Sequence, residues 1–446
     1  MGTVTFMKLT KIVIPLLLVV VLCFSWFTSI NSFSKEVILY NDYISEAQES
    51  TKDGLYEQAI EFYKKAYEEK PSEGIYNKIK EVYDLYYKEE HTAFVRNCYI
   101  ADMEAASEAY PKNANYWITV ANLYLETDNF SKAYSTVKRA YNYGAVSDSL
   151  DQIYEELLYK VTVDYKLYYN CKTALNGYIT IFDGNNWMVL DETGNQITSK
   201  YNFIGLINDE GKGIYTNDID SRLLDENEIA RARFNVNLEE ARCYDEDTGL
   251  TPVKIDGKWK YLKENGEFLA GEYEDAGSFY DKKAAVKLNG LWFVIDDNGK
   301  PISSKKFEDI KLDLYGRHLQ GDVVLAKENG KYGIYNSSME KFGDFSCDGI
   351  DICIDGELIA FKSGDKWGYV DTNGKVAIEP QYVEAKSYSN GMAAVRNDRN
   401  QWGFLNSKHK LVIDYEYLDA FYFNSNETCL VTTAENTCQL MSFMFE

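Results

Sequence analysis

The side chains best suited to catalysis or metal binding are few in this sequence, and they are not grouped. Its three histidines are His91 in a charged helical linker, His318 in a loop and His409 in a turn, and each is expected at the surface. No motif for a nucleophilic serine, a zinc peptidase, a phosphate-binding loop or a dinucleotide site occurs. We therefore predict no enzyme and no catalytic residue, although the 70 acidic residues leave a glycosidase-type carboxylate pair open.

Several turns place carboxylates beside glycine, in the patterns DETG, DDNG, DTNG and DEDTG. A calcium loop also needs further oxygen ligands at fixed spacing, such as a closing glutamate, and none recurs at a constant offset. Hairpin turns account for these residues, because Asp, Asn and Gly are the usual turn residues. We predict neither a metal ion nor a cofactor.

The eight cysteines form no C-x-x-C pair and no zinc-type spacing. Two disulfides are conceivable from sequence proximity, Cys347–Cys353 and Cys429–Cys438, since each pair falls within one repeat. Buried thiols in reducing surroundings explain the same residues equally well, so both interpretations stay open.

Length and composition limit the class of protein. The chain has 446 residues, which predicts two or three domains. Its 45% hydrophobic and 26% charged residues exclude wholesale disorder. Because 70 acidic residues face 47 basic ones, the formal charge is −23, and nucleic acid is not an expected partner.

The N-terminal segment is apolar. Residues Ile12 to Ile30 carry no charge and approach the length that crosses a bilayer. Lys8 and Lys11 precede the segment, which predicts a cytoplasmic N-terminus. We predict that residues 1–34 form a cytoplasmic tip and an uncleaved single-pass anchor, which places the rest of the chain outside the cytoplasm at the cell membrane. A cleaved signal peptide is the alternative.

Residues 35–160 show helical periodicity in pairs. Small residues recur on one face of successive helices, and a proline or an aromatic residue marks the same units. The residues that define this pattern are Ala59, Ala66, Pro71, Trp117, Ala121, Ala133 and Ala140. This pattern resembles the tetratricopeptide repeat, with about three units and extra residues near 88–92. The resemblance implies a concave surface for a peptide or protein segment, while a plain helical spacer remains open.

Residues 161–446 contain a second repeat of about 36 residues. Its aromatic marker positions are Trp187, Trp259, Trp292, Tyr332, Trp367 and Trp402, with a degenerate copy at Ser221, and glycine follows at Gly368 and Gly403. Successive markers, Ser221 included, are 34, 38, 33, 40, 35 and 35 residues apart. Each copy predicts three or four short strands, with a hairpin turn such as 371–374, and Pro380 is expected to separate two strands. We expect the marker aromatic rings in the core rather than on a ligand-stacking surface.

The marker pairs resemble the WG (KWG) repeat family of bacterial β-repeat proteins. That family has no established common enzymatic activity, and the resemblance implies an interaction scaffold. Half-copies at both ends, 161–182 and 429–443, favour a closed β-propeller of seven or eight blades, because pairing the ends hides both sheet edges. An open β-solenoid is the alternative. The predicted fold class is therefore α+β multidomain: a transmembrane helix, a tetratricopeptide-like helical solenoid and an all-β repeat domain.

These features together predict a membrane-anchored extracytoplasmic scaffold for protein–protein interaction at the bacterial cell envelope. The expected partner is an unidentified protein or peptide. A module that binds glycan or peptidoglycan is the main alternative, because the 37 tyrosines could stack on sugars of the cell wall. An envelope hydrolase is a third hypothesis, for which the sequence offers no residues.

Overall fold

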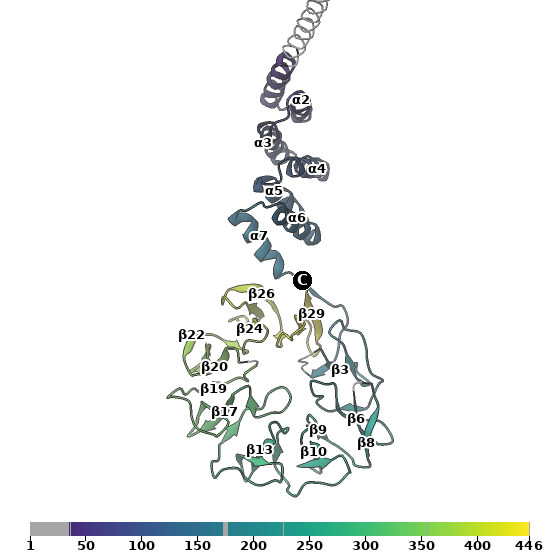
Figure 1. Ribbon diagram of the computed structural model, residues 1–446, viewed down its shortest axis with the longest axis vertical. Helices are drawn as coiled ribbons and strands as arrows, with labels where there is room; N and C mark the ends of the chain where they lie inside the picture. Colours follow the sequence, from purple (N-terminus) through teal and green to yellow (C-terminus); the bar gives the residue numbers. More distant parts are fainter. Residues whose placement is uncertain (1–34, 36, 173–176, 226, 355, 446) are drawn as a thin grey trace, which may run out of the picture. The chain divides into compact units, whose positions relative to one another are not determined.

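The computed structural model describes residues 35, 37–172, 177–225, 227–354 and 356–445. It divides into two compact units, drawn in Figure 1. The first unit extends to Leu158 and includes Phe445, and the second runs from Tyr159 to Met444. Each unit has hydrophobic clusters of its own.

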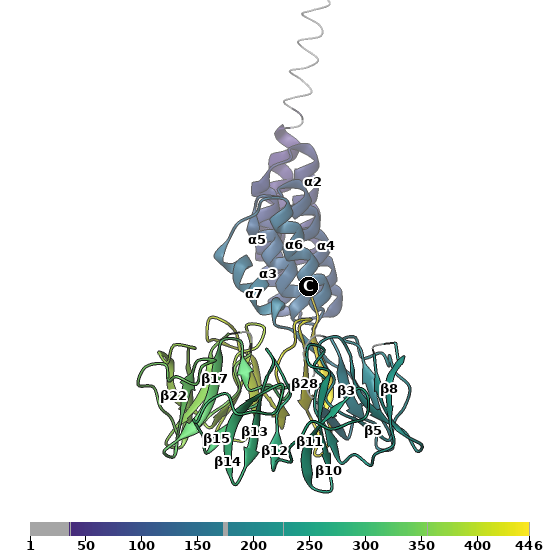
Figure 2. The ribbon, with the colours of Figure 1, turned by 60° about the horizontal axis from the view of Figure 1, so that its bottom comes forward.

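The first unit is helical, and its consecutive helices pack against one another (Figure 2). Residues 37–52 are helical, and the helices after them are α2 (Tyr56–Glu69), α3 (Glu73–Glu89), α4 (Ala93–Ala109), α5 (Ala114–Leu125), α6 (Phe130–Asn142) and α7 (Asp148–Leu158). Three begin at capping side chains: Thr92, Asn113 and Asn129 each accept a hydrogen bond from a first-turn amide, which satisfies a donor that the helix leaves unpaired.

Small residues set the spacing of these helices. Ala59, Ala66, Ala133 and Ala140 are fully buried, since a methyl group lets the neighbouring helix approach closely. The predicted unit with extra residues near 88–92 consists of α3 and α4. Its extra length lies in these helices, because they have 17 residues each whereas α2 has 14. The extra residues therefore lie mostly within the helices rather than in the loop near 88–92. The tetratricopeptide resemblance itself stays a prediction.

The predicted transmembrane helix is corrected by the structure. Throughout the part of the chain that the structure describes, no helix is long and apolar enough to cross a membrane. The uncharged helix α5, for example, has 12 residues and spans about 18 Å, against about 30 Å of hydrocarbon. The apolar segment 12–30 lies outside the described residues. The structure therefore does not support the single-pass anchor in the predicted fold class or the predicted location at the cell membrane, and neither prediction is kept.

The second unit is built from short antiparallel strands. In its described residues they form eight sheets, which Figure 1 shows arranged in a ring. We number these sheets as blades in chain order. The strands of blades 1 to 4 are β2 (Asn170–Lys172), β3 (Ile179–Phe182) and β4 (Trp187–Leu190); β5 (Phe203–Ile204), β6 (Gly213–Thr216), β7 (Ser221–Leu224) and β8 (Ala230–Phe234); β9 (Glu240–Ala241), β10 (Leu250–Ile255) and β11 (Lys258–Lys263); β12 (Asp275–Ala276), β13 (Lys283–Leu288) and β14 (Leu291–Asp296).

The later blades follow the same order. Their strands are β15 (Asp309–Ile310), β16 (Leu319–Gln320), β17 (Val323–Glu328) and β18 (Lys331–Tyr335) in blade 5; β19 (Gly349–Ile350), β20 (Ile359–Ser363), β21 (Lys366–Val370) and β22 (Val376–Tyr382) in blade 6; β23 (Glu384–Ala385), β24 (Ala393–Arg396), β25 (Trp402–Leu405) and β26 (Leu411–Tyr417) in blade 7; β27 (Asp419–Ala420), β28 (Thr428–Thr432), β29 (Gln439–Phe443) and β1 (Val161–Val163) in blade 8.

The two ends of this unit meet in blade 8. Strand β1 pairs antiparallel with β29, with Val161 opposite Phe443 and Val163 opposite Met441. Each end thus supplies the partner that the other lacks, and β1 covers the edge of β29 as the outer strand of the blade. The prediction of a closed propeller is confirmed, with eight blades, and the open solenoid is excluded.

The glycine after the marker tryptophan has a steric cause. A Cβ on Gly368 would lie 2.3 Å from the carbonyl oxygen of Ile378, and one on Gly403 would lie 2.7 Å from that of Ile413. In both blades the fourth strand, β22 or β26, crosses directly over the glycine with a shifted register. In blades 1, 3 and 4, where a larger residue follows the marker, the fourth strand is reduced to isolated bridges. Blade 2 keeps β8 beside Arg222, and blade 5 has only bridges beside Gly333, so the steric requirement for glycine is specific to blades 6 and 7.

Two predicted details of the repeat change. Pro380 lies inside the outer strand β22 rather than between two strands, where the register shift and the strand edge tolerate its missing N–H. The 40-residue interval between Trp292 and Tyr332 is explained by blade 5, in which residues 311–322 separate β15 from β17. In blade 4 the corresponding segment, residues 277–282, separates β12 from β13.

Candidate interaction surfaces

The helical unit contains a groove of about 590 Å³, formed where α2 begins and α3 ends. Gly54, with φ of +74°, turns the chain into α2, because glycine adopts this left-handed conformation without strain. The next residue, Leu55, is half exposed at the rim. The full lining is Gly54, Leu55, Tyr56, Glu57, Gln58, Glu61, Tyr86, Glu89 and Glu90.

Two tyrosines hold the walls of this groove together. The rings of Tyr56 and Tyr86 stack with their centroids 5.4 Å apart. Each hydroxyl donates to a carboxylate of the other helix, Tyr56 to Glu89 at 2.9 Å and Tyr86 to Glu57 at 2.8 Å. Burial and the bond to Glu57 raise the pKa of Tyr86 to about 12, and the bond to Glu89 raises the pKa of Tyr56. Both phenols therefore stay protonated donors at neutral pH.

The charge of the groove is negative. Its lining holds four glutamates and neither lysine nor arginine. Lys65, one turn from the groove, pairs with Glu61 at 2.7 Å and lowers the pKa of that carboxyl group. An acidic, partly apolar groove of this size suits an extended cationic segment, whose lysine or arginine side chains would meet the carboxylates.

The propeller has a second feature that recurs in every blade. The segment that follows each short first strand is bonded to the neighbouring blade, and together these segments form an inner belt. The links that join blades 1 to 8 in order are Lys172 Nζ to Ile204 O, Leu206 N to Ala241 O (3.0 Å), Arg242 Nη1 to Ala276 O (2.6 Å), Ser278 N to Gly316 O (2.7 Å), Cys353 N to Gln320 Oε1 (2.6 Å), Ser387 N to Asp351 Oδ2 (2.8 Å) and Ser389 Oγ to Phe423 O (2.6 Å).

Cations of the belt cover alternate marker rings. Lys172 lies 4.7 Å from the Trp187 ring, Arg242 4.3 Å from the Trp259 ring, and similar pairs occur in blades 5 and 7 (Lys311 with Tyr332, Lys386 with Trp402). Burial lowers the pKa of Lys172 to about 8. All four cations already have partners besides the rings: Lys172 and Arg242 donate to carbonyl oxygens, and Lys311 and Lys386 pair with Asp309 and Asp419. The belt therefore stabilises the ring of blades and leaves little capacity for a ligand.

The residues singled out from the sequence do not converge on one site. Trp259, Trp292, Tyr332 and Trp402 are buried, and Trp187 and Trp367 are half buried. Each is the first or second residue of its strand: β4, β11, β14, β18, β21 or β25. In the helical unit Trp117 and Ala121 are buried with the four alanines already described, while Pro71 is exposed after the end of α2. Sequence analysis did not identify the acidic groove, whose two walls lie about thirty residues apart.

The remaining candidates for chemistry are dispersed. His91 stacks on Tyr87 and His409 bonds to Tyr388, both on the exposed side. His318, expected at the surface, is 1% exposed, and burial lowers its pKa to about 4. Within the described residues no group of three or more His, Cys, Asp or Glu side chains could hold a metal ion.

The acidic turns have a structural use. Asp371 accepts hydrogen bonds from the amides of Asn373 and Lys375, both at 2.9 Å, and Asp191 and Asp296 do the same in their turns. Most tyrosines are likewise accounted for by the core, where rings such as Tyr215, Tyr261, Tyr335 and Tyr369 are almost fully buried. The tyrosine excess therefore gives little support to a sugar-binding surface.

The cysteine pairing differs from both predicted disulfides. Cys171 is bonded to Cys438, while Cys347 and Cys429 are thiols. The register of β28 and β29 places Met441 opposite Cys429, so Cys438 lies at the far end of that hairpin and cannot reach it.

The fold and these surfaces define a protein with a helical unit followed by an eight-bladed β-propeller. Three segments of the propeller, residues 261–292, 367–400 and 402–432, match the family model of the WG containing repeat. Two of the matches begin at a marker, Trp367 and Trp402, which confirms WG repeats in the C-terminal region. No curated protein matches the sequence.

Solved structures of low identity resemble parts of the chain. Hsv2 of Kluyveromyces lactis is 9% identical over 52% of this chain and 92% of its own, with a TM-score of 0.35. The WD40 β-propeller domain of Doa1 is 12% identical over 64% and 96%, with a TM-score of 0.33. The tetratricopeptide domain of Sgt2 from Aspergillus fumigatus is 16% identical over 26% and 74%, with a TM-score of 0.20. At these TM-scores we draw no conclusion from them.

Proposed function

We propose that this protein is a non-catalytic interaction scaffold whose helical unit binds a cationic segment of a partner protein. The observation that carries the proposal is the acidic groove between α2 and α3. It combines four glutamates, two tyrosines fixed by hydrogen bonds, and the exposed side chain of Leu55 in about 590 Å³. The WG repeats of the propeller support a scaffold role, because repeat domains offer extended surfaces.

Electrostatics gives the proposal a measurable form. The chain carries a formal charge of −23, so any cationic peptide is attracted to it at long range. Binding in the groove is therefore identified by a loss of affinity that occurs when groove charges, but not other charges, are removed. Each exposed carboxylate–ammonium pair contributes about 0.2–1 kcal/mol. Removal of two groove charges is therefore expected to weaken binding by about 0.4–2 kcal/mol, or roughly two- to thirtyfold.

The test uses a fluorescein-labelled peptide of alternating lysine and glycine, with a glycine–serine peptide as the neutral probe. The double variant Glu61→Gln/Glu90→Gln is compared with Glu68→Gln/Glu108→Gln, which removes the same charge from the same helical unit outside the groove. We expect the cationic peptide to bind the wild type and the second variant alike, and the groove variant about two- to thirtyfold more weakly. An equal loss of affinity in both variants would show that net charge determines binding and would refute the groove as the binding site.

A further inference from the structure

The junction between blade 8 and blade 1 differs from the other seven. Each of the other junctions is bridged by belt hydrogen bonds within a continuous run of chain. At this junction, which we call the seam, the two ends of the propeller meet: β29 at the C-terminal end pairs with β1, and the chain continues from β1 into β2 of blade 1. The pairing of β1 with β29 covers three residues on each strand, and it is extended by single backbone bonds from Met444 N to Lys160 O and from Asp164 N to Leu440 O.

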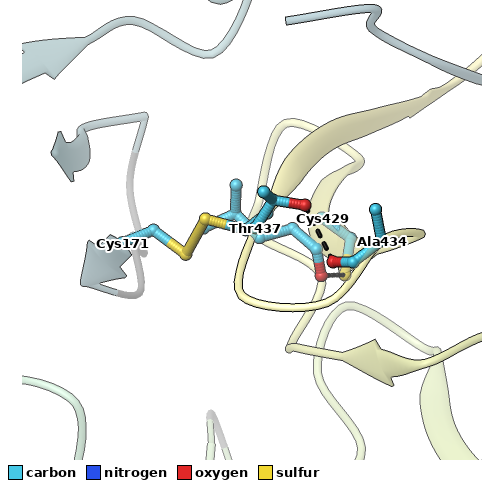
Figure 3. Close-up of a disulfide and its surroundings, with 6 residues drawn as sticks. Cys171, Cys429, Ala434 and Thr437 are labelled. Carbon is cyan, nitrogen blue, oxygen red and sulfur yellow. Dashed lines mark hydrogen bonds between the residues drawn. A yellow bond between two sulfur atoms is a disulfide. The ribbon is translucent and has the colours of Figure 1, made fainter. Parts of the chain in front are cut away.

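A disulfide crosses the seam. Cys171 lies in β2 of blade 1, and Cys438 directly precedes β29 of blade 8; Figure 3 shows the bond beside the β28–β29 hairpin. The two cysteines are 267 residues apart in sequence. The chain between them passes through all eight blades, so the bond converts the ring into a covalently closed circle.

The contacts beside the bond show what it holds together. Tyr168 and Cys438 exchange backbone hydrogen bonds of 2.9 and 2.8 Å across the seam. A hydrophobic cluster spans the same junction and includes Tyr168, Ile181, Met188, Leu430 and Leu440. Separation of the seam would expose this cluster together with the edge of β29.

We propose that the Cys171–Cys438 pair is a redox-controlled clasp on the propeller. Cys438 is 3% exposed, whereas Cys171 is only half buried, so a dithiol reductant attacks from the Cys171 side. The reaction is balanced: the sulfur–sulfur bond breaks, Cys171 and Cys438 each gain one electron and one proton, and the dithiol becomes a disulfide. Oxidising surroundings keep the circle closed and reducing ones open the clasp.

The reduced ring keeps its fold but loses the covalent part of its closure. The three-residue pairing of β1 with β29 is then the main backbone connection at the seam, and its opening no longer requires a bond to break. Blade 4, on the opposite side of the ring in blade order, is unaffected, because its links to blades 3 and 5 contain no disulfide. The proposal concerns the propeller alone and does not depend on the acidic groove.

The experiment is hydrogen exchange by mass spectrometry on the full chain, with and without dithiothreitol. We expect reduction to accelerate exchange in peptides that cover β1 and β29 at least tenfold, with β12–β14 unchanged. Cys171→Ser should show the fast exchange without reductant, and Cys98→Ser, in the helical unit, should behave as the wild type.

Two results would overturn the clasp. One is a non-reduced peptide map in which the Cys171 and Cys438 peptides are not linked. The other is a seam that exchanges at the same rate in the oxidised and reduced wild type, which would make the bond irrelevant to closure. Because reduction is applied to the folded wild type, the outcome stands even where the serine variant fails to fold.

Discussion

Replacement of Gly368 by alanine tests the steric explanation of the tryptophan–glycine pair. The added methyl carbon would lie 2.3 Å from the carbonyl oxygen of Ile378 and 2.7 Å from the nitrogen of Pro380. An ordinary carbon–oxygen contact is about 3.3 Å or more, so β22 must retreat by about 1 Å. Both obstructing atoms belong to the backbone, and no side chain can swing away to relieve the overlap.

The expected magnitude follows from these contacts. Overpacking of this kind costs about 1–3 kcal/mol, and we take the upper end because the backbone itself is displaced. A lost ladder hydrogen bond increases this destabilisation by about 1 kcal/mol. The alanine also reduces the conformational freedom of the unfolded chain, which offsets about 0.4–1 kcal/mol of the loss. The net loss in the free energy of unfolding is about 3 kcal/mol, or a Tm lower by roughly 6–12 °C.

The assay is thermal and urea-induced unfolding of the full chain, followed by circular dichroism in the β-sheet region. Gly349→Ala is the matched control, since it lies in β19 of the same blade and its added carbon would meet side-chain atoms alone, the nearest being Lys362 Cβ at 3.3 Å. We expect the control to change stability by less than about 1 kcal/mol. If Gly368→Ala is as stable as the control, β22 does not require glycine there, and the steric explanation of the repeat is wrong.

Three further predictions concern buried groups. Burial lowers the pKa of His318 to about 4, so below about pH 6.5 the histidine is protonated in the unfolded chain but stays neutral in the folded one. As the pH falls from 6.5 towards 4, the free energy of unfolding therefore decreases by about 3 kcal/mol. His318→Gln should remove this slope, measured as Tm against pH relative to the wild type, while Asp313, whose pKa burial raises to about 6, contributes the opposite slope to both proteins. Asp351→Ala should destabilise the propeller by about 2–3 kcal/mol in urea, because Tyr422 and a blade 7 amide both donate to this carboxylate; an intact stability would show the link to be dispensable. Trp117→Ala should destabilise the helical unit by about 3–5 kcal/mol and shift only its unfolding transition, and a shift of the propeller transition instead would contradict the division into two units.

Much of the propeller could be predicted because its repeat is local. Marker residues, turns and strands fall within about 36 residues, so hydrophobic alternation and Asn-Gly turns indicate each copy. The steric role of Gly368 was less visible, since it depends on β22 crossing over the residue with a shifted register. Helix pairs were also indicated by local periodicity, whereas the capping roles of Thr92, Asn113 and Asn129 came from the structure.

The candidate site could not be predicted in the same way. The acidic groove combines Glu57 and Glu61 of α2 with Glu89 and Glu90 at the end of α3, and a helical pattern does not state which turns of two helices face each other. Charge alone was uninformative, because acidic residues are common throughout this chain. The burial of His318 was missed for a related reason: it lies in the long blade 5 segment, whose path depends on other blades.

The sequence by itself determined the two repeat regions, their helical and β character and the closure expected from its two half-copies. Periodicity is a local property, so it survives without knowledge of the fold. Only the tertiary structure decided that β1 pairs with β29 and that Cys171, rather than Cys429, joins Cys438. Those contacts join residues more than 260 positions apart, and the ring of eight blades, not proximity in sequence, brings them together.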